Sequence, residues 1–392
     1  MNFIKKGMFA VLKRNIKSWG SICSLMLLFS CSVSAQDKFY TSPVVNKDNS
    51  VTFSVYAPQA NDVSVEMLNS GITSIGSTKM VKDKDGLWQV TLAPFTPEIY
   101  YYLFNTDGSK HTDNKNQNIK KWLNSVSVFE ISGPEPLIHE LQSVSHGSIH
   151  QHYYDSKATS TQRLVNIYTP PHYSIDKKYP VLFLLHGWGG ANDGWLEYGK
   201  IQNIADNLLA ENKMEPMIIV MPDSHPLGRE FEKSPVNWES YTKYLNQNNP
   251  LLDQDIKESL LPFIKQNYAV ETESSKLAIA GLSMGGQQAI EIGFSQPNTF
   301  GSVISLSGSY YGEQQYQDLE AFNGKVKATN NQTQLFWLMY GKDELTHNES
   351  PKKLQKWLSS KGVDFQWTEE LGGHEWDTWR RNAVRFLPIL FK

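Results

Sequence analysis

The chain has 392 residues, of which 40% are hydrophobic and 12% aromatic, so it is long enough for two domains or for one large domain with a sizeable core. Its formal net charge is −3 at pH 7, and a mildly acidic chain argues against nucleic acid as a partner. The sequence contains no internal repeat and no low-complexity tract.

The first 35 residues have the features of a signal peptide. Five basic residues and no acidic residue precede an apolar run at residues 22–29, and Val33, Ser34 and Ala35 suit cleavage by a signal peptidase. The apolar run is shorter than the roughly 20 residues that a membrane-spanning helix needs. We therefore expect residues 1–35 to be removed and the mature protein to be exported to the periplasm or the medium.

A second processing site overlaps this segment. Leu28, Phe29, Ser30 and Cys31 resemble a bacterial lipobox, and lipidation of Cys31 would instead attach the protein to the outer membrane. The other cysteine, Cys23, also lies in the leader, so the mature chain would have no disulfide and would depend on its hydrophobic core. Loss of the five basic residues changes the formal charge from −3 to −8.

Short alternating segments separated by turns predict an all-β domain over residues 37–132. Asp85-Gly86 and Asp107-Gly108 are turn signals between these segments. The spacing of the segments is typical of a small β-sandwich, and the glycine and prolines of residues 133–140 predict a linker after it. The expected strands are residues 51–56, 63–67, 88–92, 100–104 and 125–131.

Residues 141–392 predict an α/β domain with a mostly parallel central sheet. After two β segments at residues 147–154 and 163–168, short apolar runs alternate with helical stretches, which indicates strands that are buried on both faces. The expected strands are residues 181–185, 217–221, 277–280, 303–306, 335–340 and 365–368. The expected helices are residues 201–211, 252–266, 351–361 and 376–390.

The segment Gly-Leu-Ser-Met-Gly at residues 281–285 is a G-x-S-x-G motif between an expected strand and an expected helix. A sharp strand-to-helix turn of this kind is a nucleophile elbow, which would expose the Ser283 hydroxyl above the edge of the sheet. The N-terminus of the following helix favours developing negative charge. Ser283 is therefore the candidate nucleophile, and the alternative is a surface serine in a glycine-rich turn.

An acyl-transfer serine needs a base and an acid, which in the α/β-hydrolase plan follow in the chain order serine, acid, histidine. His374, on a glycine loop before the last expected helix, is the candidate base. The acid should follow the strand at residues 335–340, where Asp343 and Glu344 compete. Aspartate is the commoner residue type, whereas the spacing from Gly341 favours Glu344, so we prefer Glu344 and keep Asp343 as the alternative.

The oxyanion pocket is expected to combine two backbone N–H groups. One belongs to Met284, which follows the nucleophile. The other should come from the glycine-rich loop at residues 186–190, where the Trp188 N–H is the first choice and the Gly187 N–H the second. The alternative is a loop that serves only to make a tight turn.

No metal site and no cofactor are predicted. The ten histidines lack the H-E-x-x-H motif or a comparable spacing, and there is no phosphate-binding loop. His146, His150 and His152 lie close together in the sequence, but polar residues at a strand edge explain them as well.

Several hydrolase motifs occur together in residues 179–392: residues 186–190, Trp195, Gly199, and residues 216–222, 281–286, 372–376 and 379–380. With these motifs, this part of the chain resembles the esterase D-like branch of the α/β-hydrolases. Within that branch the chain is most similar to secreted bacterial feruloyl and acetyl-xylan esterases of the first carbohydrate esterase family, which usually have aspartate where Glu344 stands. Residues 41–131 are similar, by a looser pattern, to the isoamylase N-terminal type of β-sandwich, a carbohydrate-binding-like module.

This resemblance implies a serine esterase that removes feruloyl or acetyl groups from plant cell-wall xylan, with an acylated polysaccharide or oligosaccharide as its partner. It makes Trp188, Trp195 and Trp376 candidates to stack on a feruloyl ring or a sugar, and core packing is the alternative for each. Two other interpretations stay open. The same triad acts on a siderophore ester or on a small acyl ester or thioester, or the chain is a glycan-binding protein that has lost catalysis.

Overall fold

The computed structural model describes residues 39–69, 73–121, 125–229, 237–310 and 333–392. The predicted signal peptide and the candidate lipidation site Cys31 lie outside the described residues. No helix in these ranges is long and apolar enough to cross a membrane.

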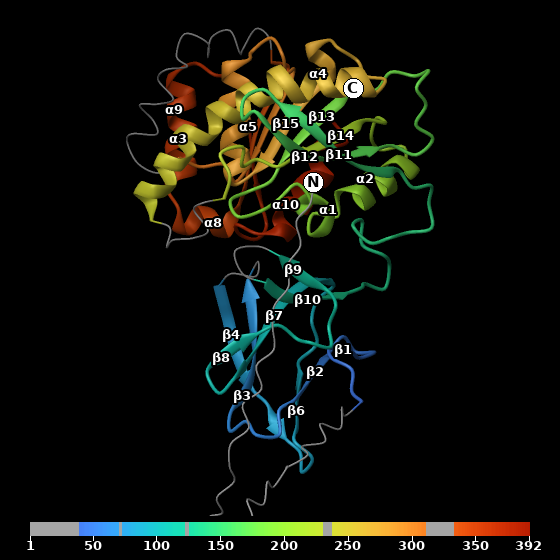
Figure 1. The fold of residues 1–392 in the computed structure, drawn as a ribbon, viewed down its shortest axis with the longest axis vertical. Helices are drawn as coiled ribbons and strands as arrows, with labels where there is room; N and C mark the ends of the chain where they lie inside the picture. Colours follow the sequence, from blue (N-terminus) through green and yellow to red (C-terminus); the bar gives the residue numbers. More distant parts are fainter. Residues whose placement is uncertain (1–38, 70–72, 122–124, 230–236, 311–332) are drawn as a thin grey trace, which may run out of the picture. The chain divides into compact units, whose positions relative to one another are not determined.

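The N-terminal part folds as two antiparallel sheets (Figure 1). One sheet has the strand order β1-β2-β6-β5, and the other has the order β4-β3-β7-β10-β9 with β8 paired to β7. The first sheet contains β1 (Val44–Val45), β2 (Val51–Tyr56), β5 (Val81–Lys82) and β6 (Leu87–Leu92). The second contains β3 (Val63–Asn69), β4 (Thr73–Lys79), β7 (Glu98–Thr106), β8 (Ser109–His111), β9 (Ile119–Lys121) and β10 (Ser125–Ile131).

Side chains from both sheets form one hydrophobic core between them. Phe53 of β2 and Tyr102 of β7 are fully buried and meet edge to face, with ring centroids 4.8 Å apart. The turn residues Gly86 and Gly108 both have a φ of 88°, which suits glycine. The predicted all-β sandwich is therefore confirmed, and the strands expected at residues 51–56 and 125–131 have the predicted bounds.

The rest of the chain is built around a sheet with the strand order β11-β12-β14-β13-β15-β16-β17-β18. Pairing is parallel from β14 through to β18, and β11 and β12 are antiparallel additions at one edge, so the mostly parallel sheet is confirmed. The strands are β11 (Ser148–Ser156), β12 (Thr161–Thr169), β13 (Val181–Leu185), β14 (Ile218–Pro222), β15 (Leu277–Leu282), β16 (Ser302–Leu306), β17 (Leu335–Gly341) and β18 (Gln366–Glu370).

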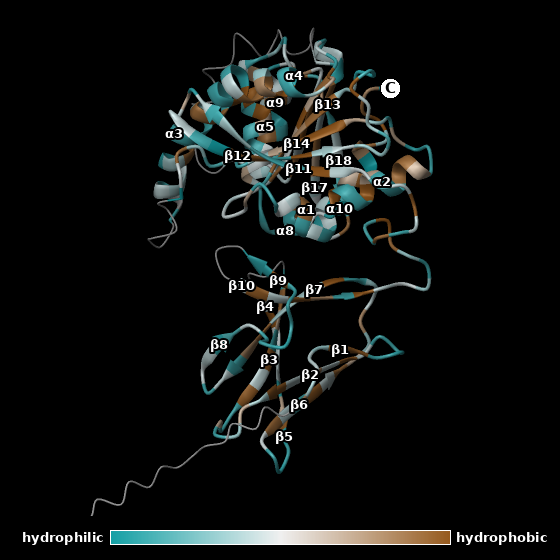
Figure 2. Ribbon diagram, turned by 45° about the vertical axis from the view of Figure 1, so that its right-hand side comes forward, coloured by the Kyte–Doolittle hydropathy of each residue, from teal (hydrophilic) through white to brown (hydrophobic). Residues whose placement is uncertain are grey.

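Helices cover both faces of this sheet, whose central strands are the most hydrophobic part of the domain (Figure 2). One face packs against η2, α4, α5 and α9, and the other against α1, α2 and α10. The helices are α1 (Gly194–Glu197), α2 (Ile201–Ala210), α3 (Trp238–Asp255), the π-helical turn η2 (Ile256–Leu260), α4 (Leu261–Asn267), the 3₁₀ turn η3 (Ser274–Lys276), α5 (Met284–Ser295), α8 (Lys342–His347), α9 (Ser350–Ser360) and α10 (Trp376–Phe386).

The helix expected at residues 252–266 begins earlier than predicted, at Trp238 of α3. Asn237 caps this helix, because its side chain accepts a hydrogen bond from the Ser240 N–H while the Ser240 hydroxyl accepts one from the Asn237 N–H. Pro250 lies inside the helix, although a proline normally ends one. The predicted start after Pro250 was therefore wrong.

The parallel strands decide where the candidate site lies. The carboxyl ends of β13, β15, β17 and β18 lead into the glycine-rich loop at residues 186–190, Ser283, α8 and the loop that contains His374. Carboxyl ends of parallel strands meet at one edge of a sheet, which is where open α/β sheets bind their ligands.

Candidate active site

Ser283 lies at the sharp turn between β15 and α5. Its backbone has a φ of 54° and a ψ of −118°, a strained conformation that few residues adopt away from functional sites. The Ser283 N–H donates a hydrogen bond to the Leu306 carbonyl of the neighbouring strand at 2.7 Å, which holds the turn in place. The turn also needs glycine at 281, where a Cβ would stand 2.3 Å from the Gly285 carbonyl oxygen.

Replacing Gly281 with alanine is expected to destabilise the fold and lower hydrolytic activity. The added methyl group would meet backbone atoms of Gly285 and the Leu185 Cβ at 2.9 Å, and overpacking of this kind costs about 1–3 kcal/mol. Gly76→Ala is the matched control, because nothing lies within 4 Å of a Cβ there. Thermal unfolding of both variants checks the prediction, which fails if their midpoints are equal.

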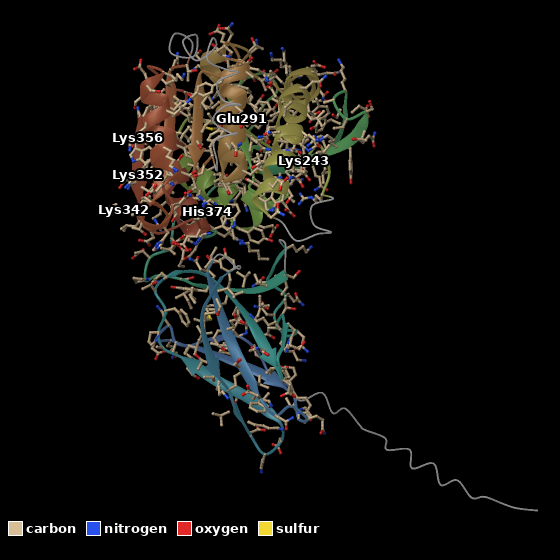
Figure 3. The ribbon with its side chains drawn as sticks, turned by 90° about the vertical axis from the view of Figure 1, so that its left-hand side faces the viewer. Lys243, Glu291, Lys342, Lys352, Lys356 and His374 are labelled. Atoms are coloured by element: carbon tan, nitrogen blue, oxygen red, sulfur yellow. The ribbon has the colours of Figure 1, made fainter. Side chains whose placement is uncertain are left out.

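His374 reaches Ser283 from the loop between β18 and α10. The Nε2 of His374 lies 2.9 Å from the Ser283 Oγ, and the imidazole packs edge to face on Trp379, with ring centroids 5.1 Å apart. Figure 3 shows His374 at the same end of the α/β domain as Lys342, the first residue of α8. The nearby Gly373 N–H donates to the Glu375 carboxylate at 3.0 Å, and burial raises the pKa of Glu375.

Glu344 lies on the other side of the imidazole. Its Oε1 is 3.0 Å from the His374 Nδ1, and its side chain is only 4% exposed. The two loops can approach because Gly341, at the end of β17, has no side chain: a Cβ there would stand 2.4 Å from the Gly372 carbonyl oxygen. Asp343 is exposed, and its backbone N–H donates to that same Gly372 carbonyl at 3.0 Å.

The glycine-rich loop after β13 lies against the serine. A Cβ on Gly187 would stand 3.2 Å from the Ser283 Cβ and 2.7 Å from a methyl carbon of Leu282. Met284, the other expected oxyanion donor, is the buried first residue of α5, so its peptide lies at the positive end of the helix dipole. The structure thus brings Gly187 and Met284 next to the serine, and Trp188 follows Gly187 in the same loop.

The indole of Trp188 is half-buried in an aromatic cluster beside this loop. It contacts Tyr241 and Tyr244 of α3 edge to face, with centroid distances of 4.8 and 5.2 Å. His225 completes the cluster with its Nδ1 2.8 Å from the Tyr244 hydroxyl, and burial holds the pKa of His225 well below its usual value. The ring of Trp188 is therefore held from several sides.

Trp195 and Trp376 do not lie where the sequence interpretation put them. Trp195 is 1% exposed and donates its indole N–H to the Leu185 carbonyl at 3.0 Å. Trp376 is 7% exposed and meets Trp195 edge to face at 5.3 Å and Trp379 at 5.3 Å. Both tryptophans are core residues that pack against each other and against the sheet. The expectation that their ring faces stack on a substrate is therefore corrected.

Sequence interpretation missed a partly buried polar network that contacts the glycine-rich loop at residues 186–190. His186 is 2% exposed and contacts the Gly187 carbonyl, while Arg229 contacts the Gly190 carbonyl and the Asp223 carboxylate. The position of His186 directly before Gly187 was the one available signal. Nothing in the sequence linked Asp223 or Arg229 to the loop.

In the part of the chain that the structure describes, no group of three or more histidine, cysteine, aspartate or glutamate side chains could hold a metal ion. The histidines that are close in sequence have other partners. His146 contacts Asp206, His150 contacts Thr169 and His152 contacts Tyr268.

Comparison with known proteins shows the family of the chain. The sequence profile of the putative esterase family matches residues 156–388, and that of carbohydrate-binding module 48 (isoamylase N-terminal domain) matches residues 40–120. The chain is 29% identical to an endo-1,4-beta-xylanase/feruloyl esterase of Xylanibacter ruminicola over 358 residues, which is 89% of this chain and 46% of that relative. The chain thus spans less than half the length of that relative.

Two solved structures share the fold. A ferulic acid esterase of Anaeromyces mucronatus, in complex with ferulic acid, has a TM-score of 0.55 at 24% identity and covers 64% of this chain and 93% of its own. An enterochelin esterase of Shigella flexneri has a TM-score of 0.63 at 19% identity and covers 89% of this chain and 95% of its own. The α/β-hydrolase fold is therefore confirmed, and because the esterase profile matches more than half of its residues, the chain belongs to the putative esterase family.

Proposed function

We propose that this protein is a serine carboxylic-ester hydrolase that removes feruloyl or acetyl groups from plant cell-wall xylan through an acyl-enzyme. The observation that carries the proposal is the continuous set of contacts from the Ser283 Oγ to the His374 Nε2 at 2.9 Å and from the His374 Nδ1 to the Glu344 Oε1 at 3.0 Å. Nucleophile, base and orienting acid within hydrogen-bond reach are what acyl transfer requires.

In the first step, the Ser283 Oγ attacks the ester carbonyl carbon while the His374 Nε2 takes the hydroxyl proton. Glu344 accepts a hydrogen bond from the Nδ1–H of His374 and stabilises the positive charge that forms on the imidazole. Its low exposure supports this role, since the attraction between carboxylate and imidazolium is screened less away from water.

The carbonyl oxygen becomes negatively charged as the C–O bond forms. The N–H groups of Trp188 and Met284 would donate to it from two directions. The bond between the carbonyl carbon and the sugar oxygen then breaks while His374 gives its proton to that oxygen. The sugar departs with a free hydroxyl, and the acyl group stays on Ser283. A water molecule, deprotonated by the same imidazole, attacks the acyl carbon. The bond to the Ser283 Oγ breaks, the imidazole returns the proton to that oxygen, and the free acid is released.

The substrate class rests on the relatives. The Xylanibacter ruminicola relative, which matches most of this chain, is named an endo-1,4-beta-xylanase/feruloyl esterase. The match of residues 40–120 to a carbohydrate-binding module supports a substrate attached to a glycan.

A siderophore ester is the second candidate substrate. The enterochelin esterase of Shigella flexneri covers 89% of this chain, whereas the ferulic acid esterase covers 64%. The larger coverage extends the likeness to the N-terminal β domain, and at 19% identity it is a likeness of fold. This candidate therefore belongs in the test.

The test compares kcat/KM for methyl ferulate, feruloylated and acetylated xylo-oligosaccharides, and a ferric catecholate siderophore. We expect a feruloylated or acetylated oligosaccharide to be preferred over the siderophore by at least about 10-fold, which corresponds to about 1.4 kcal/mol of transition-state free energy. A preference for the siderophore would overturn the substrate class and leave the ester hydrolase chemistry in place. Absence of hydrolysis on every ester would overturn both.

A further inference from the structure

The loop beside Ser283 is held by its carbonyl groups. The Gly187 carbonyl oxygen lies 2.8 Å from the His186 Nδ1 and accepts the Gly190 N–H at 3.0 Å. The Gly190 carbonyl oxygen accepts a hydrogen bond from the Arg229 Nη2 at 2.5 Å, and the same nitrogen lies 3.1 Å from the Asp223 Oδ2. The side chains of His186 and Arg229 therefore contact the carbonyl groups at both ends of the short turn that contains Trp188.

The contacts of the His186 ring assign its tautomer. The Ser224 N–H donates to the His186 Nε2 at 2.8 Å, so this nitrogen carries a lone pair and the proton resides on Nδ1. The Asp223 Oδ1 is farther from Nε2, at 3.3 Å, and already accepts the His225 N–H at 2.9 Å. With Nε2 as the acceptor, the Nδ1–H of His186 donates to the Gly187 carbonyl.

The orientation of the Gly187 carbonyl fixes the orientation of the Trp188 N–H. The Gly187 carbonyl and the Trp188 N–H belong to one peptide unit, and in a trans peptide these two groups point in opposite directions. The carbonyl points at the buried His186 ring, so the Trp188 N–H points away from it. The Gly187 Cα lies on the Ser283 side of the loop, where a Cβ would stand 3.2 Å from the Ser283 Cβ.

We propose that His186, assisted by Arg229, is a positioning residue for catalysis: by holding the Gly187 carbonyl, it orients the Trp188 N–H toward the oxyanion. Neither side chain touches the reacting atoms. This inference rests on the proposed ester hydrolysis at Ser283. An oxyanion donor acts only when it is aimed beforehand at the charge that develops, so a loop free to rotate this peptide would lose much of the benefit.

A buried histidine that only fills space would have a different signature. Replacing such a histidine would lower the stability of the fold. The size of that effect would depend on the volume of the new side chain and not on which of its atoms donates a hydrogen bond. The Gly190 position shows how closely the loop follows the ring, because a Cβ there would stand 3.0 Å from the His186 Nδ1. Volume and hydrogen bonding must therefore be separated by experiment.

Replacing His186 with asparagine or with glutamine separates the effect of hydrogen bonding from that of side-chain volume. The side-chain amide of asparagine overlaps the Nδ1 position, so His186→Asn can still donate to the Gly187 carbonyl. The amide of glutamine overlaps the Nε2 position, so His186→Gln can still accept the Ser224 N–H but loses the donor to the loop. We expect His186→Gln to lower kcat for 4-nitrophenyl acetate by about 10- to 100-fold with little change in KM, and His186→Asn to lose less than about 5-fold.

Arg229→Met is the second variant, because the Arg229 side chain is 27% exposed and its replacement should be tolerated by the fold. We expect kcat to fall by about 5-fold at unchanged KM, since the contact between His186 and the Gly187 carbonyl remains. If neither His186 variant folds, this variant decides, and an unchanged kcat overturns the proposal.

Thermal unfolding midpoints and labelling by a fluorophosphonate accompany the kinetics. Equal losses in His186→Asn and His186→Gln, or losses that follow the change in midpoint, overturn the positioning role while labelling and hydrolysis by the unmodified protein uphold the proposed function. If the unmodified protein neither labels at Ser283 nor hydrolyses the ester, the proposed function fails and the inference fails with it.

Discussion

Replacing Ser283 with alanine is expected to lower kcat by at least about 10³-fold, because no acyl-enzyme can form without the hydroxyl oxygen. The fold should be retained, since the Ser283 N–H would still donate to the Leu306 carbonyl and the turn keeps its glycines. Hydrolysis of 4-nitrophenyl acetate and of a feruloylated oligosaccharide measures the loss. A fluorophosphonate probe should label the unmodified protein and leave Ser283→Ala unlabelled.

Ser295→Ala is the matched control. Ser295 is at the other end of α5, and its hydroxyl donates to Asp253 at 2.7 Å, so its loss removes a hydroxyl from the same helix but not from the candidate site. This control should label and hydrolyse normally. Substantial activity in Ser283→Ala would refute the nucleophile, and an unmodified protein that folds but never labels would favour the interpretation as a glycan-binding protein without catalysis.

The second large effect is expected for Glu344→Gln, which should lower kcat by at least about 10²-fold. Glutamine is the same size, but a neutral amide cannot balance the charge of the imidazolium. It can also present its NH₂ group to the His374 Nδ1 and so impose the wrong tautomer. Rates at saturating substrate, together with the thermal unfolding midpoint, separate this effect from a loss of fold.

Asp343→Asn is the control in the same helix and should change kcat by less than about 3-fold, because an exposed carboxylate beside the site acts only through screened charge. A larger loss for Asp343→Asn than for Glu344→Gln would transfer the acid role to Asp343. Equal and mild losses would mean that neither carboxylate orients His374.

Local patterns predicted much of the fold. The strand at residues 181–185 has the predicted bounds, since five apolar residues between turn signals form a strand buried on both faces. The helix was expected to start at residue 252, whereas the capping box of Asn237 and Ser240 sets the true start of α3. The strand β18 contains charged and partly exposed residues, which fits its place at the edge of the sheet.

Local patterns likewise predicted part of the candidate site and missed the rest. Ser283, His374, Glu344, Trp188 and Met284 were all named from motifs and chain order, because each follows a strand whose carboxyl end reaches the same edge of the sheet. The tryptophans were misplaced because an indole suits a core as well as a binding surface, and only packing distinguishes the two.

Local patterns were enough to predict the sandwich, the parallel sheet, the nucleophile elbow and the chain order of the candidate catalytic residues, since all of these depend on residues that are neighbours or follow a short period. Packing established that Glu344 and not Asp343 contacts His374, that Trp195 and Trp376 are buried, and that His186 and Arg229 hold the loop at residues 187–190. Except for the contact between His186 and the neighbouring Gly187, these contacts join residues far apart in the chain, and their geometry arises from packing, which no local pattern predicts.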